Sequence, residues 1–198
     1  MDEGGGSTIV MADPQRMIRE ITESDIRCAF LPLMAEVEAG SWFDRTNAVH
    51  FDWLQQRISR RVGSGGQFYA LYSPGQRPVG FYCLLIEVHP VFPGHAEILD
   101  IGIFEECRRQ GHGKRLVEDA ARRAAAAGAC CIYVSTYAGD SEAIAFYTRV
   151  GFRSVTELPG LNGPDDRGQM LMMMELGQPS PAAHPEGHAG APSGSAEA

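Results

Sequence analysis

A glycine-containing basic stretch, residues 108–116 (RRQGHGKRL), carries the residue types that bind phosphate groups. An apolar run over 96–104 precedes it, and a helical pattern over 111–127 follows it. The first N–H groups of a helix have no partner within the helix, and the helix dipole adds partial positive charge there. Gly111 and Gly113 allow a phosphate to approach the backbone closely. The order of strand, glycine turn and helix therefore predicts an anion site flanked by cationic side chains.

Three nucleotide-binding patterns compete for this stretch. A P-loop would need glycine at position 108 and serine or threonine after Lys114, and a dinucleotide fingerprint would need glycine at position 116. The third pattern, R/Q-x-x-G-x-G/A, is satisfied by Arg108, Gly111 and Gly113. The stretch thus resembles motif A of the GNAT superfamily, the acetyl-CoA-dependent N-acetyltransferases. A solvated basic helix start would look similar, so the surrounding chain has to decide.

Composition limits the kind of protein. The chain has 198 residues, of which 44% are hydrophobic and 21% charged, and this length and balance fit one globular domain. No apolar run reaches the length of a membrane span, and the N-terminus does not have the pattern of a signal peptide. The five cysteines lack metal-ligand spacing and are typical of reduced cytoplasmic thiols, so no metal is expected. A net charge of −8 argues against a nucleic-acid partner.

Hydrophobic periodicity and turn residues predict the elements that must position the glycine turn. Residues 1–14 are expected to be flexible, 15–176 to form a single domain, and 177–198 to form a disordered Pro/Gly/Ala-rich tail. Helices are predicted over 26–40, 51–62, 111–127 and 141–150, and strands over 17–21, 68–72, 79–88, 96–104, 130–137, 152–157 and 170–176. The fold class is α/β, with a mixed central sheet of about seven strands and helices on both faces.

A second segment supports the resemblance. Residues 140–152 (DSEAIAFYTRVGF) resemble the A-x-x-x-Y-x-x-x-G-F segment of GNAT proteins, and they follow motif A by one helix and one strand. The resemblance covers about residues 16–176 and implies a GNAT-like fold with acetyl-CoA as co-substrate. Asp140 stands where many members carry asparagine, and a carboxylate cannot donate a hydrogen bond to the pantetheine as an amide can.

The resemblance also implies where the co-substrate binds. The turn amides would hold the pyrophosphate, and the pantetheine would pair with the strand edge around Ile101 to Ile103, as an added strand would. This requires a splay between strands 96–104 and 130–137. The expected cofactor-binding residues are Ile101, Ile103, Arg108, Arg109, Gln110, Gly111, His112, Gly113, Lys114, Asp140 and Tyr147.

Acetyl transfer to an amine needs a base and an acid. Most amines are protonated at neutral pH and attack only after losing a proton. Glu97 matches the position of the catalytic glutamate in some GNAT members, and Asp100 is the alternative base. In an ideal strand these two carboxylates face opposite sides, so only one would point at the site. Tyr147 matches the tyrosine that protonates the leaving thiolate in many members, although an amphipathic core tyrosine would show the same pattern.

The acceptor is the part of the reaction that the sequence determines least. Acidic side chains outnumber basic ones between residues 12 and 106, whereas the two kinds nearly balance between 107 and 176. Aromatic faces beside carboxylates suit a cationic amine, such as an amino-sugar antibiotic, a polyamine or an amino-acid derivative. We therefore expect a small amine acceptor and a cytoplasmic monomer or homodimer. A protein N-terminal or lysine acetyltransferase and a non-catalytic acyl-CoA sensor are alternatives. The candidate acceptor residues are Glu36, Trp42, Phe43, Asp44, Asp52 and Trp53.

Overall fold

The computed structural model of the chain describes residues 17–39, 47–87, 94–159 and 168–177. The elements, in chain order, are β1 (Ile18–Ile21), α1 (Glu23–Asp25), the π-helical turn η2 (Ile26–Phe30), α2 (Leu31–Ala39), α3 (Ala48–Gly63), β2 (Gln67–Tyr72), β3 (Pro78–Glu87), β4 (Gly94–Ile103), the 3₁₀ turn η3 (Glu105–Cys107), α4 (His112–Ala126), β5 (Ala129–Tyr137), α5 (Ser141–Arg149), β6 (Arg153–Leu158) and β7 (Gln169–Glu175). This is the predicted order, with ends that differ by a few residues at most sites.

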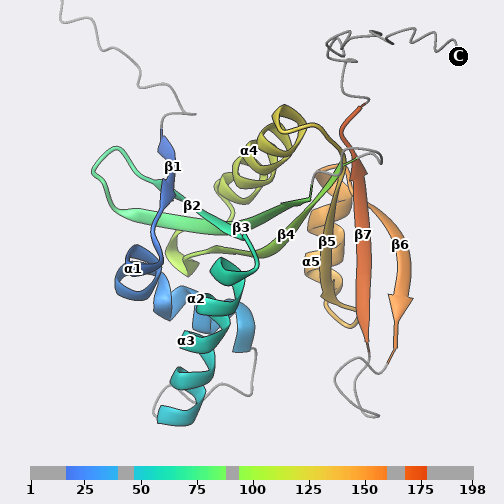
Figure 1. The fold of residues 1–198 in the computed structure, drawn as a ribbon. Coiled ribbons are helices and arrows are strands. Elements are labelled where there is room, and N and C mark those ends of the chain that lie inside the picture. Colours follow the sequence, from blue (N-terminus) through green and yellow to red (C-terminus); the bar gives the residue numbers. More distant parts are fainter. Residues whose placement is uncertain (1–16, 40–46, 88–93, 160–167, 178–198) are drawn as a thin grey trace, which may run out of the picture.

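One mixed sheet organises these elements (Figure 1). Its seven strands lie in the order β1-β2-β3-β4-β5-β7-β6. Neighbouring strands are antiparallel except β4 and β5, which are parallel and are connected through α4. The structure confirms the predicted α/β class and the mixed central sheet.

Two hydrophobic cores lie on opposite faces of the sheet. On one face, α4 and α5 bury side chains such as Leu116, Val117 and Tyr147. On the other face, η2, α2 and α3 bury side chains such as Phe30 and Leu54. Burying a large apolar side chain contributes roughly 1.5–3 kcal/mol, so both helical layers are held firmly against the sheet.

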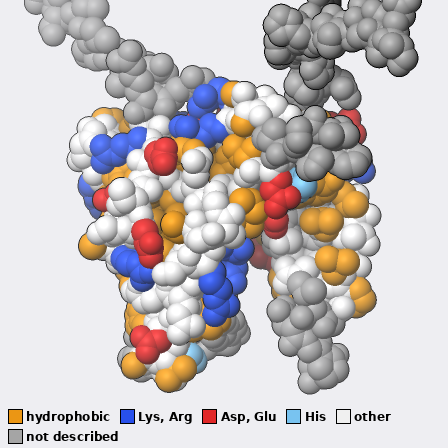
Figure 2. All heavy atoms as spheres, viewed as in Figure 1, with side chains coloured by type: hydrophobic (Ala, Val, Ile, Leu, Met, Phe, Trp, Pro, Cys, Tyr) orange, Lys and Arg blue, Asp and Glu red, His pale blue; other side chains and the backbone are white. Residues whose placement is uncertain are grey.

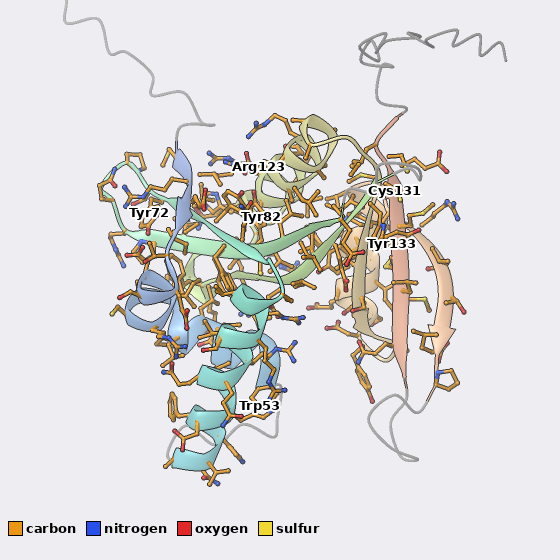
Figure 3. All side chains as sticks on the ribbon, in the orientation of Figure 1. Trp53, Tyr72, Tyr82, Arg123, Cys131 and Tyr133 are labelled. Atoms are coloured by element: carbon orange, nitrogen blue, oxygen red, sulfur yellow. The ribbon has the colours of Figure 1, made fainter. Side chains whose placement is uncertain are left out.

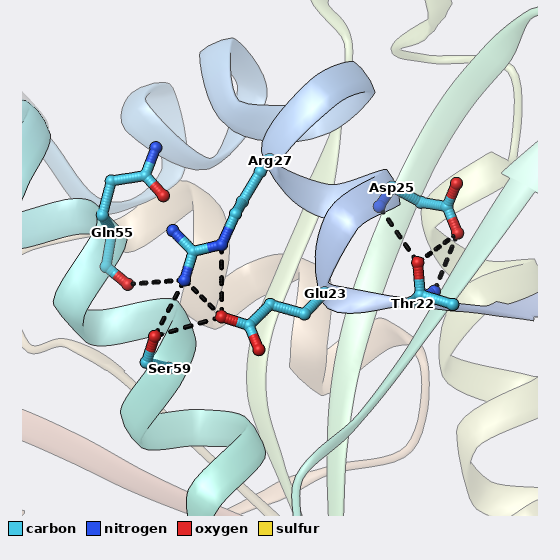
Figure 4. A network of polar contacts seen from close by, with 6 residues as sticks. All are labelled: Thr22, Glu23, Asp25, Arg27, Gln55 and Ser59. Atoms are coloured by element: carbon cyan, nitrogen blue, oxygen red, sulfur yellow. Dashed lines mark hydrogen bonds and ion pairs between the residues drawn. The ribbon is translucent and has the colours of Figure 1, made fainter.

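The N-terminal helical segment is tied to α3 by a polar network (Figure 4). The Arg27 guanidinium contacts the Glu23 carboxylate, and its Nη2 donates to Ser59 Oγ of α3 at 2.8 Å. Ser59 Oγ in turn donates to Glu23 Oε1 at 3.1 Å. These hydrogen bonds from Arg27 and Ser59 lower the pKa of Glu23, so its carboxylate stays ionised above mildly acidic pH. The network fixes one side of α3, the helix that faces β4.

Candidate active site

The sheet opens between β4 and β5. Their pairing runs from Gly94↔Ala129 to Ile98↔Val134, and the described structure shows no pair between these strands beyond that point. The following part of β4 stays paired with β3, and Tyr82↔Ile101 is one of its pairs. The following part of β5 stays paired with β7. The two strands therefore diverge, as Figure 1 shows, and one edge of residues 101–103 faces the opening. This is the predicted splay.

The glycine turn lies at the mouth of this opening. Gly111 is the N-cap of α4 and has a left-handed backbone with φ of 81°. Arg109 also has a positive φ, 62°, which turns the chain sharply before the helix. A Cβ atom at Gly113 would lie 3.1 Å from the Phe146 ring of α5, which is closer than most real contacts. Glycine at position 113 thus allows the start of α4 to lie close to α5 and leaves the first N–H groups of α4 accessible.

A pocket of about 810 Å³ joins the splay to the turn. It is lined by the end of β4, the turn, the first residues of α4 and one side of α5. Of the predicted cofactor-binding residues, those that line it are Ile101, Ile103, Arg108, Arg109, Gly111, His112, Gly113, Lys114, Asp140 and Tyr147. Gln110 is not among the lining residues, and its Nε2 donates to the Glu106 carbonyl at 3.2 Å.

Sequence reasoning missed part of the α5 wall. Ala143, Phe146 and Val150 line the pocket with Tyr147. Their spacing of three and four residues is the signal that could have identified them, since residues so spaced share one helix face. Cys107, Ser141, Glu142 and Arg149 also line the pocket.

Asp140 serves as a helix cap. Its Oδ1 accepts a hydrogen bond from the Ala143 N–H at 2.9 Å, at the N-terminus of α5. Aspartate and asparagine are equally good at this position because both offer an acceptor oxygen to the free helix N–H groups. The carboxylate found in place of the more usual amide therefore preserves the start of α5, and with it the position of Tyr147.

Tyr147 is buried and lines the pocket. Its ring packs edge-on against Phe146 and Phe152, with centroid distances of 5.2 and 5.6 Å. Burial raises the pKa of the Tyr147 phenol, and the Asp140 and Asp100 carboxylates raise it further. The phenol is therefore protonated throughout the neutral range.

A β-bulge in β4 changes which way those carboxylates point. Cys83 pairs with Asp100 and Leu84 pairs with Ile98, so Leu99 is an extra residue in the strand. Ile98 and Ile101 consequently both pack in the α4 core, although strict alternation would place them on opposite faces. Glu97 and Asp100 likewise share the face toward α3, and both interact with Arg61. The expectation that they face opposite sides is wrong, because an ideal strand has no bulge.

The two carboxylates differ in their surroundings. The Asp100 side chain is only 1% exposed, and both of its oxygens are paired with arginines of α3. Arg61 Nε lies 3.1 Å from Oδ2, and Arg57 Nη2 lies 3.4 Å from Oδ1. Glu97 is half-buried, and burial raises its pKa, although Arg61 and His95 oppose the shift. Glu97 is the more exposed of the two carboxyl groups, whereas both oxygens of Asp100 are engaged by arginines.

Comparison with known proteins identifies this architecture. The model of the acetyltransferase (GNAT) family matches residues 20–152, which include the splay, the turn and all of α5. The chain belongs to the GNAT family. It is therefore a GNAT-type acyltransferase, and the glycine turn described above lies within the matched residues. No curated protein sequence matches the chain.

Solved GNAT-like structures share the fold at low sequence identity. A Bacillus subtilis acetyltransferase in complex with CoA is 20% identical, covers 80% of this chain and 97% of its own, and has a TM-score of 0.60. The ribosomal-protein-S18-alanine N-acetyltransferase of Escherichia coli is 18% identical, with coverage of 84% and 97% and a TM-score of 0.62. A spermidine N-acetyltransferase chimera from Vibrio cholerae and hSSAT is 17% identical, with coverage of 80% and 94% and a TM-score of 0.63.

The candidate acceptor residues of this GNAT protein lie in different settings. Glu36 Oε2 of α2 is 3.7 Å from Arg108 Nη2, beside the glycine turn. Asp52 is exposed on α3, and Trp53 is half-buried with the Arg57 guanidinium 5.5 Å above its ring. Trp42, Phe43 and Asp44 lie outside the described residues.

Two further properties concern the described residues alone. No group of three or more histidine, cysteine, aspartate or glutamate side chains among them could hold a metal ion. None of the helices that they form is both long and apolar enough to cross a membrane.

Proposed function

We propose that this GNAT enzyme transfers the acetyl group of acetyl-CoA directly to a primary amine of a small acceptor, within a ternary complex. The observation that supports this proposal is that the open edge of β4 and the phenol of Tyr147 line one pocket beside the glycine turn. Glu97 lies on β4, one residue before the pairing of β4 with β5 ends.

The lining of the pocket offers the groups that coenzyme A would need. Its mouth offers the N–H groups at the start of α4 together with Arg108, Arg109 and Lys114, which suit a pyrophosphate. Its inner wall offers the open edge of residues 101–103, which can pair with the amides of the pantetheine. When bound, acetyl-CoA supplies the thioester carbonyl that the amine attacks.

Residues on the two sides of the splay carry out the two proton transfers of the reaction. Glu97 takes the proton of the attacking amine, directly or through water. Tyr147 donates its proton to the departing sulfur and remains protonated beforehand because its pKa is raised. Asp100 is the weaker candidate for the base, because both its oxygens are engaged by arginines.

The transfer is tested with acetyl-CoA and a panel of amines that includes amino sugars, polyamines, and amino acids with their derivatives. Release of the free thiol and the mass of the acetylated product are measured together. At least one amine should yield both signals. If acetyl-CoA binds but no amine in the panel is acetylated, the proposed transfer reaction is refuted, and an acyl-CoA-sensing role becomes the better explanation.

A second prediction concerns the pH dependence of the base. Since burial raises the pKa of Glu97 above its ordinary value of 4.5, protonation on acidification should remove activity at a higher pH than for an exposed glutamate. Glu97→Gln should abolish this acid limb and lower kcat/KM at pH 7 by about tenfold or more. The measurement is kcat/KM at each pH from 5 to 9. The substrate concentration is expressed as that of the unprotonated amine, so that titration of the amine itself does not shape the profile.

The matched control is Glu20→Gln on the edge strand β1, where the glutamate is exposed. This variant should keep the wild-type pH profile. An acid limb that persists unchanged in Glu97→Gln would show that another group is the base.

A further inference from the structure

The bulge in β4 lies where this strand parts from β5. Leu99 is the extra residue in the register of β4 with β3. The pairing of β4 with β5 ends one residue before it, at Ile98↔Val134. An extra residue interrupts the ladder of hydrogen bonds between strands, so its backbone needs another partner. A group from outside the sheet can supply that partner.

Arg61 of α3 contacts the bulge at both of its residues. Its Nη2 donates to the Leu99 carbonyl at 3.2 Å and lies 3.4 Å from Asp100 Oδ1. Its Nε donates to Asp100 Oδ2 at 3.1 Å. The Asp100 side chain is only 1% exposed, so water has little access to this pair. A planar guanidinium that contacts both oxygens of a carboxylate fixes the orientation of the two groups.

The backbone of Arg61 is also held in place. Arg61 lies in the last turn of α3, and Figure 2 shows basic side chains along the edge of this helix that borders the hollow between the two halves of the molecule. The Arg61 carbonyl accepts hydrogen bonds from Ser64 Oγ at 2.9 Å and from the Gly66 N–H at 2.8 Å. The arginine is therefore fixed at both ends, and it connects the end of α3 to the bulge.

The bulge decides on which face of β4 the Glu97 side chain lies. Leu99 adds one residue between Glu97 and Asp100, so that both face α3, whereas strict alternation would place them on opposite faces. Glu97 pairs in register with Tyr133 of β5, which is labelled in Figure 3. This pair is one residue before the end of the pairing between the two strands. An interaction that holds the bulge therefore also holds the orientation of Glu97 relative to Asp100 and α3.

We infer that Arg61 is a positioning residue for acetyl transfer, because it holds the bulge of β4 and thereby keeps the Glu97 carboxyl group oriented for the acceptor amine. This inference rests on the proposed reaction, in which Glu97 is the base. Arg61 is not among the residues that line the pocket, so it acts through Glu97 and not on the co-substrate. Small displacements of a reacting group lower the rate strongly, so an arginine outside the pocket can affect the reaction.

Arg61→Lys tests this role. Lysine keeps the positive charge beside Asp100, so the fold should persist, but one ammonium cannot reproduce the fork that contacts the carboxylate and the Leu99 carbonyl. We expect kcat/KM for the best amine of the panel to fall about fivefold or more. The Kd for acetyl-CoA, measured by calorimetry, should stay at the wild-type value. The calorimetric stoichiometry gives the fraction of binding-competent protein, to which the rates are normalised.

The matched control is Arg60→Gln, the neighbouring arginine of α3. Arg60 is exposed, and its Nη2 contacts Gln56 of the same helix. This variant should keep the wild-type values of both kcat/KM and Kd.

A double variant shows whether Arg61 acts through the base. If it does, Arg61→Lys combined with Glu97→Gln should be no slower than Glu97→Gln alone, because a base that has been removed cannot be displaced. Losses that multiply in the double variant would show that Arg61 supports the reaction independently of Glu97.

The pH profile separates orientation from charge. The charged and titratable groups around Glu97 are Arg61 of α3, His95 and Asp100 of β4, Glu87 of β3 and Tyr133 of β5. Burial raises the pKa of Glu97, and the Arg61 cation opposes this shift. Lysine keeps the cation, so the acid limb of Arg61→Lys should stay at the wild-type pH while the plateau falls. An unchanged plateau with a limb moved to higher pH would refute the positioning role.

The outcomes separate the inference from the reaction on which it rests. If Arg61→Lys keeps the wild-type kcat/KM, or if its loss multiplies with that of Glu97→Gln, the positioning role is refuted and the transfer reaction stands. If Glu97→Gln is fully active, the assignment of the base and the inference fail, although acetyl transfer is still observed. If no amine is acetylated although acetyl-CoA binds, the reaction fails and the inference fails with it.

Discussion

Gly113→Glu is expected to abolish acetyl-CoA binding while the protein stays folded. The new carboxylate would stand in the first turn of α4, where the helix dipole favours a negative charge, so the helix itself should tolerate it. The same charge would occupy and repel the position of the pyrophosphate. We expect the Kd for acetyl-CoA to rise at least about a hundredfold, which corresponds to about 2.7 kcal/mol. Isothermal titration calorimetry provides the measurement.

The control for this substitution is Ala125→Glu, which adds the same carboxylate to an exposed position of α4 away from the pocket. Its affinity for acetyl-CoA should equal that of the wild type. At Gly113 the new Cβ would also press on the Phe146 ring, so a small loss of thermal stability is expected there. Wild-type affinity in a folded Gly113→Glu protein would contradict the assignment of the cofactor pocket.

Tyr147→Phe is expected to lower kcat by roughly ten- to a thousandfold, the scale of acid catalysis, with little change in acetyl-CoA affinity. The substitution keeps the buried ring between Phe146 and Phe152 and removes only the phenolic proton. Because burial raises the pKa of this phenol above 10, the wild type should show no basic limb from Tyr147 below pH 10. The rate of the acetyl transfer step is measured by single-turnover kinetics. Slow product release could hide a decrease in this rate under steady-state conditions.

Tyr72→Phe serves as the matched control, because Tyr72 lies on β2 beside Arg19, away from the splay. Its kcat should be unchanged. A Tyr147→Phe enzyme that retains wild-type single-turnover rates would show that the tyrosine is a packing residue, and water or another donor would then protonate the sulfur.

The sequence by itself determined the order of the elements and the anion-binding turn. Hydrophobic periodicity marked α3 and α4 because each buries one stripe of apolar side chains, and alternating or apolar runs marked the strands. Gly111 and Gly113 marked the turn because the backbone conformation and close packing there require glycine. These properties depend on residues near one another in the chain, and the predicted splay followed from the family resemblance that they supported.

Only the tertiary structure decided how the carboxylates of β4 are arranged. An extra residue in β4, seen in its register with β3, places Glu97 and Asp100 on one face. Hydrophobic periodicity could not predict this, because it assumes an ideal strand with strict alternation. The arginines of α3 lie about forty positions before Asp100, so no local pattern connects them. A buried carboxylate needs a partner, and only folding shows which cations it pairs with and which way they face.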